Sequence, residues 1–125
     1  MHPHRTRLLA AILALLALAG CSSGGSRRDG TSRSRNVITA DEIGTVQVAN
    51  AYQLVERLRP HFLRPRGPAN ELVVYVDNLP LGGVPALTDV NIARVREVRF
   101  LDSREATTRF GGGHRSGAIL VFTKQ

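Results

Sequence analysis

The feature that most limits how this chain can fold is a stretch, Ser22 to Asn36, without a single apolar side chain. It reads SSGGSRRDGTSRSRN and consists mainly of Ser, Gly and Arg. Such a composition cannot bury enough apolar surface to offset the entropy of ordering, so residues 21–35 are predicted to form a flexible tether. The stretch therefore confines the folded core to residues 36–125, which is room for one small domain.

Before the tether lies an apolar segment with the pattern of a secretion signal. Arg5 and Arg7 precede the uninterrupted run LLAAILALLALA, from Leu8 to Ala19. At about 1.5 Å of rise per residue, this run is too short to span a bilayer, which takes about 20 residues. A basic beginning followed by a short apolar run and small residues predicts a secretory signal peptide over residues 1–20.

The end of this signal, Leu18-Ala19-Gly20-Cys21, resembles the lipobox of bacterial lipoproteins. The resemblance implies that the Cys21 thiol carries a diacylglycerol, that cleavage occurs before it, and that the new amine is acylated, for instance with palmitate. Ser22 in place of Asp implies the outer membrane under the enterobacterial sorting rule, and we expect the domain to face the periplasm. The alternatives are ordinary secretion with an incidental cysteine, or an uncleaved anchor. Because Cys21 is the only cysteine, no intrachain disulfide can form.

The net charge of +7 does not predict a nucleic-acid partner. Most of the basic excess lies in the signal and the tether, and acidic and basic residues are interspersed and nearly balanced in residues 36–125. A nucleic-acid surface needs basic charge concentrated on one face. The arginines of the tether either rest on anionic lipid head groups or remain solvated, and composition favours the second.

The first half of the domain carries signals for two helices and two strands. NVI predicts a short strand, and Thr39 with Glu42 forms a capping box for a single helical turn ended by Gly44. Asn50 with Gln53 predicts a second capping box. The helix that follows has one apolar face and stops before Pro60. That face comprises Val48, Ala51, Val55, Leu58 and Phe62. Residues 59–70 are predicted to be a loop, and ELVVYV, residues 71–76, a strand.

The second half begins with DNLPLGGVP, whose Asp, Asn, Pro and Gly residues predict turns. A short return strand is predicted around Leu81. Thr88 is expected to cap a short helix through Ala93. Residues 95–102 predict a strand with one polar face, and a helix opened by an Asp102–Glu105 box follows it. AILVFT, residues 118–123, is apolar throughout and predicts a central strand. The fold class is therefore α/β (α+β), a small mixed sheet of about four strands with two to three short helices.

A glycine-rich loop precedes the last strand and raises the question of phosphate binding. Phosphate-binding loops run from a strand into a helix, whereas here the predicted order is helix, loop, strand. Gly112 and Gly117 have P-loop spacing, but Ala118 and Ile119 follow instead of Lys and Ser or Thr. The loop is interpreted as a bend with exposed side chains, and as a candidate docking surface. Its residues are Gly111, Gly112, Gly113, His114 and Arg115.

No catalytic or metal-binding set is recognisable elsewhere. His61 and His114 stand alone in sequence, without the cysteines or paired carboxylates of a metal site. Ser103 has no histidine nearby, and Asp102 and Glu105 are explained by capping. We therefore expect no enzyme activity, no cofactor and no metal.

Residues 71–124 resemble the plug domain of TonB-dependent outer-membrane receptors. The matching parts are Val76-Asp77-Asn78, the strand from Val95 to Leu101, Phe110-Gly111, and Gly117 to Lys124. NVITADEI and NAYQLVERLRP resemble the first strand and helix of the family, so the likeness covers nearly all of residues 36–125. The resemblance implies a plug-like fold and a domain that docks onto envelope proteins. The chain ends at Gln125, directly after the plug-like stretch, so we expect no barrel and no transport pore, and we find no energising box in the tether.

Three hypotheses for function remain. The first is a lipid-anchored binding module that contacts another envelope protein, such as an outer-membrane receptor or barrel. The second is a structural or assembly lipoprotein without a specific ligand. The third is a binder of a small ligand, or an enzyme, that uses the loop between Gly111 and Gly117.

Overall fold

The computed structural model describes residues 35–68 and 72–125. The predicted signal peptide, Cys21 and nearly all of the predicted tether lie outside the described residues. Within them, five strands form one mixed sheet in the order β1-β4-β5-β2-β3. The strands are β1 (Val37–Ile38), β2 (Val73–Val76), β3 (Leu79–Gly82), β4 (Val95–Leu101) and β5 (Ala118–Thr123). Only β2 and β5 pair in parallel; the other neighbours are antiparallel.

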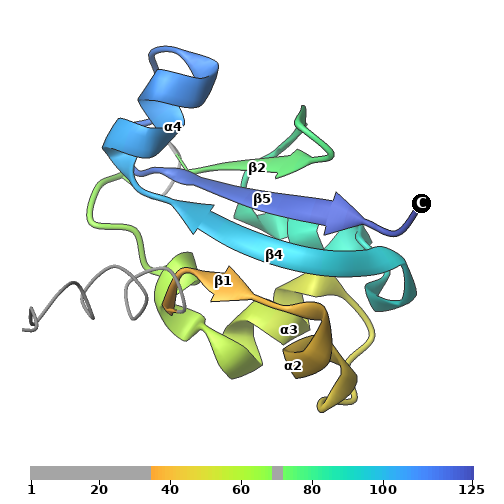
Figure 1. The fold of residues 1–125 in the computed structure, drawn as a ribbon. Helices are drawn as coiled ribbons and strands as arrows, with labels where there is room; N and C mark the ends of the chain where they lie inside the picture. The colour runs from red at the N-terminus through yellow and green to blue at the C-terminus, as the bar shows by residue number, and fades with distance from the viewer. Residues whose placement is uncertain (1–34, 69–71) are drawn as a thin grey trace, which may run out of the picture.

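Helices cover the two faces of the sheet unequally. The α-helices are α2 (Ala40–Gly44), α3 (Ala51–Leu58) and α4 (Ser103–Phe110), and 3-10 turns occur at η1 (Pro60–Leu63), η3 (Val84–Asp89) and η4 (Ile92–Arg94). Figure 1 shows α2 and α3 on one side of the sheet, with α4 at one end. The predicted fold class is confirmed, and the return strand predicted around Leu81 is β3, which brings the sheet to five strands.

Strand β5 lies in the middle of the sheet and is covered on both faces, as its apolar sequence predicts. Ile119 and Val121 face a large core that includes Leu54, Val55 and Phe62. Ala118 and Leu120 face a smaller core that includes Ala106 of α4. Alternate side chains of a strand point to opposite faces, so this one strand supplies both cores.

The capping predictions hold at both ends of the domain. Thr39 and Glu42 form a complete capping box on α2, and Asp102 and Glu105 form one on α4. Asn50 accepts a hydrogen bond from the Gln53 N–H, as predicted, but the Gln53 side chain accepts from the N–H of Ala49 rather than from Asn50. These local hydrogen bonds satisfy backbone donors that the first helical turn leaves open.

Two of the predicted helices are wrong in extent or type. The apolar face predicted from Val48 to Phe62 is split, because Val48 precedes α3 and Phe62 lies in η1 beyond the proline. Thr88 does not cap a helix: its hydroxyl donates to the carbonyl of Pro85 within η3, and Asn91 caps η4 instead. Prolines near the start of η1 and η3 favour short 3-10 turns over longer α-helices.

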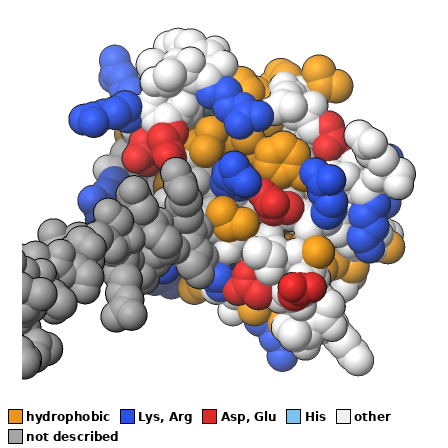
Figure 2. Space-filling view, viewed as in Figure 1, with side chains coloured by type: hydrophobic (Ala, Val, Ile, Leu, Met, Phe, Trp, Pro, Cys, Tyr) orange, Lys and Arg blue, Asp and Glu red, His pale blue; other side chains and the backbone are white. Residues whose placement is uncertain are grey.

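On the side of the sheet where α4 covers only one end, polar and apolar side chains are mixed. Arg99 pairs with Glu97 at 2.7 Å, and its guanidinium lies over the ring of Phe122. Figure 2 shows hydrophobic side chains lying among Lys, Arg, Asp and Glu on the face in view. The polar face predicted for residues 95–102 is therefore present, although Arg99 on this face covers part of the apolar surface of Phe122.

Candidate functional site

The glycine-rich loop connects the carboxyl end of α4 to β5, the order that argues against a phosphate-binding loop. Gly111 ends α4 with φ 89° and ψ −167°, a backbone conformation that is essentially confined to glycine. Gly117 also has a positive φ, of 87°, and a Cβ there would collide with the carbonyl oxygen of Leu101. These glycines are therefore explained by backbone geometry.

His114 is buried, which contradicts the prediction that it is exposed. Only 6% of its surface is accessible, and its Nε2 lies 2.8 Å from the hydroxyl of Tyr75. Its Nδ1 lies 2.9 Å from the carbonyl oxygen of Gly111. A carbonyl only accepts, so Nδ1 donates, and in the neutral ring Nε2 accepts from Tyr75. His114 thus ties the loop to β2, a contact between residues distant in sequence that the loop sequence does not signal.

Aromatic stacking reinforces this attachment. The rings of Tyr75 and Phe110 stack with centroids 3.9 Å apart, and the His114 ring lies within 6 Å of both. Phe110 is the last residue of α4, so the stack holds the end of this helix against β2. The loop is consequently held in place by side chains of β2 and α4.

A second contact joins the loop to the segment after η1. The Ser116 hydroxyl donates to the carbonyl oxygen of Pro68 at 2.7 Å. A Cβ on Gly67 would come within 2.7 Å of that same hydroxyl oxygen, so the two segments approach closely at the glycine. Arg115, between His114 and Ser116, remains exposed as predicted. Of the predicted docking loop, Arg115 and the glycines at 111–113 are thus at the surface, and His114 is not.

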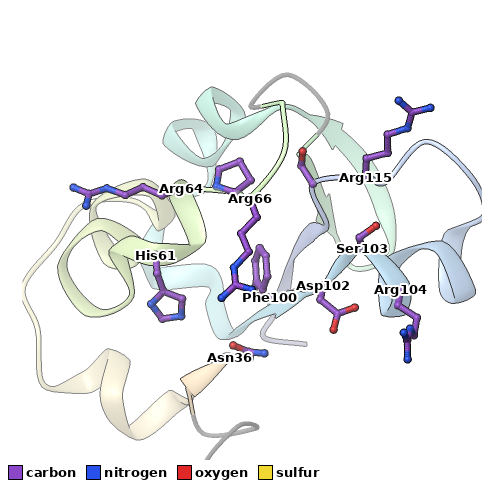
Figure 3. A pocket seen from close by; sticks show the side chains of 11 residues that line it. Asn36, His61, Arg64, Arg66, Phe100, Asp102, Ser103, Arg104 and Arg115 are labelled. Atoms are coloured by element: carbon purple, nitrogen blue, oxygen red, sulfur yellow. The ribbon is translucent and has the colours of Figure 1, made fainter.

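A cleft of about 700 Å³ opens where these two segments meet the start of α4. Its lining includes arginines from the post-η1 segment, from α4 and from the glycine-rich loop, and Figure 3 shows their arrangement. These basic residues lie far apart in sequence, which is why no linear motif predicted the cleft. Ser103 and Asp102 also line it.

The opposite end of the sheet carries an exposed apolar edge. Asp77 and Asn78 both have positive φ and form the tight turn between β2 and β3, as the DN pair predicts. On β3, Leu79 is 72% exposed and Leu81 is 47% exposed. Asp77 accepts hydrogen bonds from the hydroxyl and the N–H of Thr123, and these bonds lower the pKa of its carboxyl. This ties the hairpin to the end of β5.

The remaining candidate residues have structural surroundings. His61 is exposed and contacts the edge of the Phe62 ring. Asp102 and Glu105 cap α4 as predicted. Within residues 35–68 and 72–125, no group of three or more His, Cys, Asp and Glu side chains is placed to hold a metal ion. In the same residues, no helix is both long and apolar enough to cross a bilayer.

No protein-family model matches the sequence, and no curated protein matches it. Two solved structures of the ferric enterobactin receptor do resemble the fold, one of them a substituted form from Pseudomonas aeruginosa in complex with enterobactin. Both align with a TM-score of 0.54, at 17% and 18% identity. Each alignment covers 71% of this chain but only 17% of the receptor chain.

The chain has a plug-like fold. The receptors are TonB-dependent, and the likeness confirms the fold that the sequence resemblance implies. At these identities the likeness concerns the fold, so it transfers neither a ligand nor a partner to this chain.

Proposed function

We propose that this protein is a non-catalytic, lipid-anchored module that binds an outer-membrane receptor barrel from the periplasmic side. The observation that carries the proposal is the similarity of the fold to about a sixth of an outer-membrane receptor. The lipobox-like sequence ending at Cys21 supplies the anchor, and the tether after it supplies reach.

Arg115 is the side chain we assign to docking. Its loop is held to β2 through His114 and to the segment after η1 through Ser116, so the exposed guanidinium extends from a fixed backbone. A preorganised loop loses little conformational entropy on binding. Arginine is also enriched in protein interfaces, where its planar group makes several hydrogen bonds at once.

Docking is tested by photo-cross-linking in living cells. A benzoylphenylalanine replaces Gly112, an exposed residue of the same loop where a side chain meets nothing within 4 Å, in one strain and Glu56, an exposed residue of α3, in the control strain. We expect a discrete adduct with an outer-membrane barrel protein from position 112 and none from position 56. Equal labelling from both positions, or adducts only with soluble proteins, would refute docking through the loop.

The anchor is tested separately by metabolic labelling with a clickable fatty acid. We expect the parent chain to be labelled and to fractionate with the outer membrane, and the Cys21→Ala chain to be unlabelled, because Cys21 is the only thiol. The Ser22→Ala chain is the matched control and should label normally. Label retained in Cys21→Ala would disprove the lipoprotein assignment without affecting the docking result.

A further inference from the structure

The cleft beside the glycine-rich loop gathers positive charge from three separate segments. Of the residues that the structure describes, four arginines line it, two after η1, one in α4 and one in the loop, namely Arg64, Arg66, Arg104 and Arg115. Among the described residues, Asp102 is the one carboxylate in the lining, and it already accepts the N–H of Glu105 as the helix cap. The cleft therefore has a large excess of positive charge for a domain whose charges are otherwise nearly balanced.

These four guanidinium groups lack the carboxylate partners that Arg59 and Arg99 have. Arg59 pairs with Glu42 at 2.6 Å, and Arg99 pairs with Glu97. Within the described part of the chain, none of the four makes a salt bridge or a side-chain hydrogen bond. Like charges gathered around one cleft repel each other, and an anion would relieve that repulsion.

The geometry of the cleft suits a small anion with several oxygens. Figure 3 shows the Arg66 side chain beside the ring of Phe100, inside the cleft, while Arg64, Arg104 and Arg115 extend outward from its rim. The Ser116–Pro68 hydrogen bond fixes the distance between the segments that carry Arg66 and Arg115. A single guanidinium group can donate hydrogen bonds to two oxygens of one phosphate. The long arginine side chains at the rim can also fold over a bound phosphate.

The direction of α4 adds to this preference. Ser103 and Arg104 are its first residues, so the positive end of the helix dipole faces the cleft. Gly111, where the glycine-rich loop begins, lies at the negative end of the same helix. An anion is thus favoured near the start of α4, where Arg115 from the far end of the loop also lies, and not at the glycines that follow α4.

We propose that this cleft binds phosphate groups. Two sources share that chemistry, the head group of an anionic phospholipid and a soluble phosphate. The chain enters the domain at Asn36, which itself lines the cleft, so a lipid anchor before the tether would keep the cleft near a membrane surface. The proposal does not depend on docking to a barrel.

The experiment is isothermal titration calorimetry on the full chain in micelles of a neutral detergent. One arm adds inorganic pyrophosphate. The other adds soluble dihexanoylphosphatidylglycerol, with dihexanoylphosphatidylcholine as the neutral reference. We expect saturable binding in at least one arm, none of the zwitterionic lipid, and weakening as salt rises. Binding in the first arm alone identifies a soluble source, and binding in the second identifies the lipid.

A matched pair of variants locates the site. The cleft variant is Arg66→Gln with Arg104→Gln, and the control is Arg57→Gln with Arg96→Gln, which removes the same charge from exposed positions outside the lining. The tether is identical in both. We expect at least tenfold weaker binding in the cleft variant and less than about twofold change in the control. Equal weakening of both variants, or no binding in either arm, would overturn the proposal.

Discussion

The imidazole of His114 joins the glycine-rich loop to a strand through a hydrogen bond at each nitrogen, and it is almost entirely buried. Removing it would leave the Tyr75 hydroxyl without this partner in a buried position. A buried polar group deprived of its partner costs more free energy than the hydrogen bond contributes on balance. His114 is therefore a structural residue of the loop, and Arg115 beside it is the exposed one.

We predict that His114→Ala lowers the free energy of unfolding by about 1–3 kcal/mol. Arg115→Ala, the neighbouring exposed residue, should change it by less than about 0.5 kcal/mol. Urea unfolding followed by circular dichroism measures both. If the two variants were equally stable, the hydrogen bond to Tyr75 would have no energetic role.

Two glycines of the same loop provide a second comparison. A methyl group at Gly117 would collide with the Leu101 carbonyl and would require a positive φ, whereas at Gly112 it meets nothing within 4 Å. We predict that Gly117→Ala costs at least about 2 kcal/mol, from strain and overpacking. Gly112→Ala should change stability by less than about 0.5 kcal/mol. Thermal unfolding distinguishes the two, and a stable Gly117→Ala protein would show that β5 can shift away from β4.

At the scale of secondary-structure elements, the central strand β5 and the caps of α2 and α4 follow from local sequence. Their signals lie within a few residues: an uninterrupted apolar run, or Thr and Asp three residues before Glu. The burial of His114 does not follow, because it depends on Tyr75, which lies 39 residues away. The cleft escapes prediction for the same reason.

The role of β5 gives a prediction for its side chains. Leu120 is 1% exposed in the core beneath α4, whereas Leu79 on the edge strand β3 is 72% exposed. Leu120→Ala should lower the free energy of unfolding by about 2–4 kcal/mol, from lost burial and the cavity left behind. Leu79→Ala should cost less than about 0.5 kcal/mol. Chemical denaturation measures both, and similar values would contradict the central position of β5.

The contact between the β2–β3 turn and β5 predicts a dependence on pH. The hydroxyl and N–H of Thr123 lower the pKa of Asp77, so the folded state binds its proton less readily than the unfolded state. The stability that this contact contributes is fully present at pH values above the ordinary aspartate pKa. It is lost as the pH falls through the lowered pKa of Asp77. Asp77→Asn should therefore reduce the acid-induced loss of stability.

Urea unfolding at a series of pH values from about 6 to 2 tests this, since that range spans ordinary carboxyl pKa values. Asp89→Asn, which alters an exposed carboxylate outside the contact, is the control. The control should lose as much stability in acid as the parent chain does. A parallel response of Asp77→Asn and the parent would show that Asp77 contributes nothing to the pH dependence.

For the molecule as a whole, the order of elements and the likeness to a plug domain predicted the class of fold, and the solved receptors confirm it. The order of the strands in the sheet was not predictable from residues 36–125, because it depends on which strands meet in space. The two short strands β1 and β3 form the edges, and α4 covers only one end of its face. The exposed apolar edge at β3 and the gathering of arginines around the cleft are thus properties of the assembled sheet.

We expect Arg59 to strengthen the domain against a pull on its N-terminal end. Its guanidinium hydrogen bonds to the carbonyls of Arg35 and Val37 and to Glu42, so it fastens the point where the chain joins the sheet. A pull on the preceding residues would reach β1 first, and β1 pairs with β4 through only two residues. Such a short edge strand would peel away before the rest of the sheet yields. We therefore expect Arg59 to raise the force needed to detach β1 from β4.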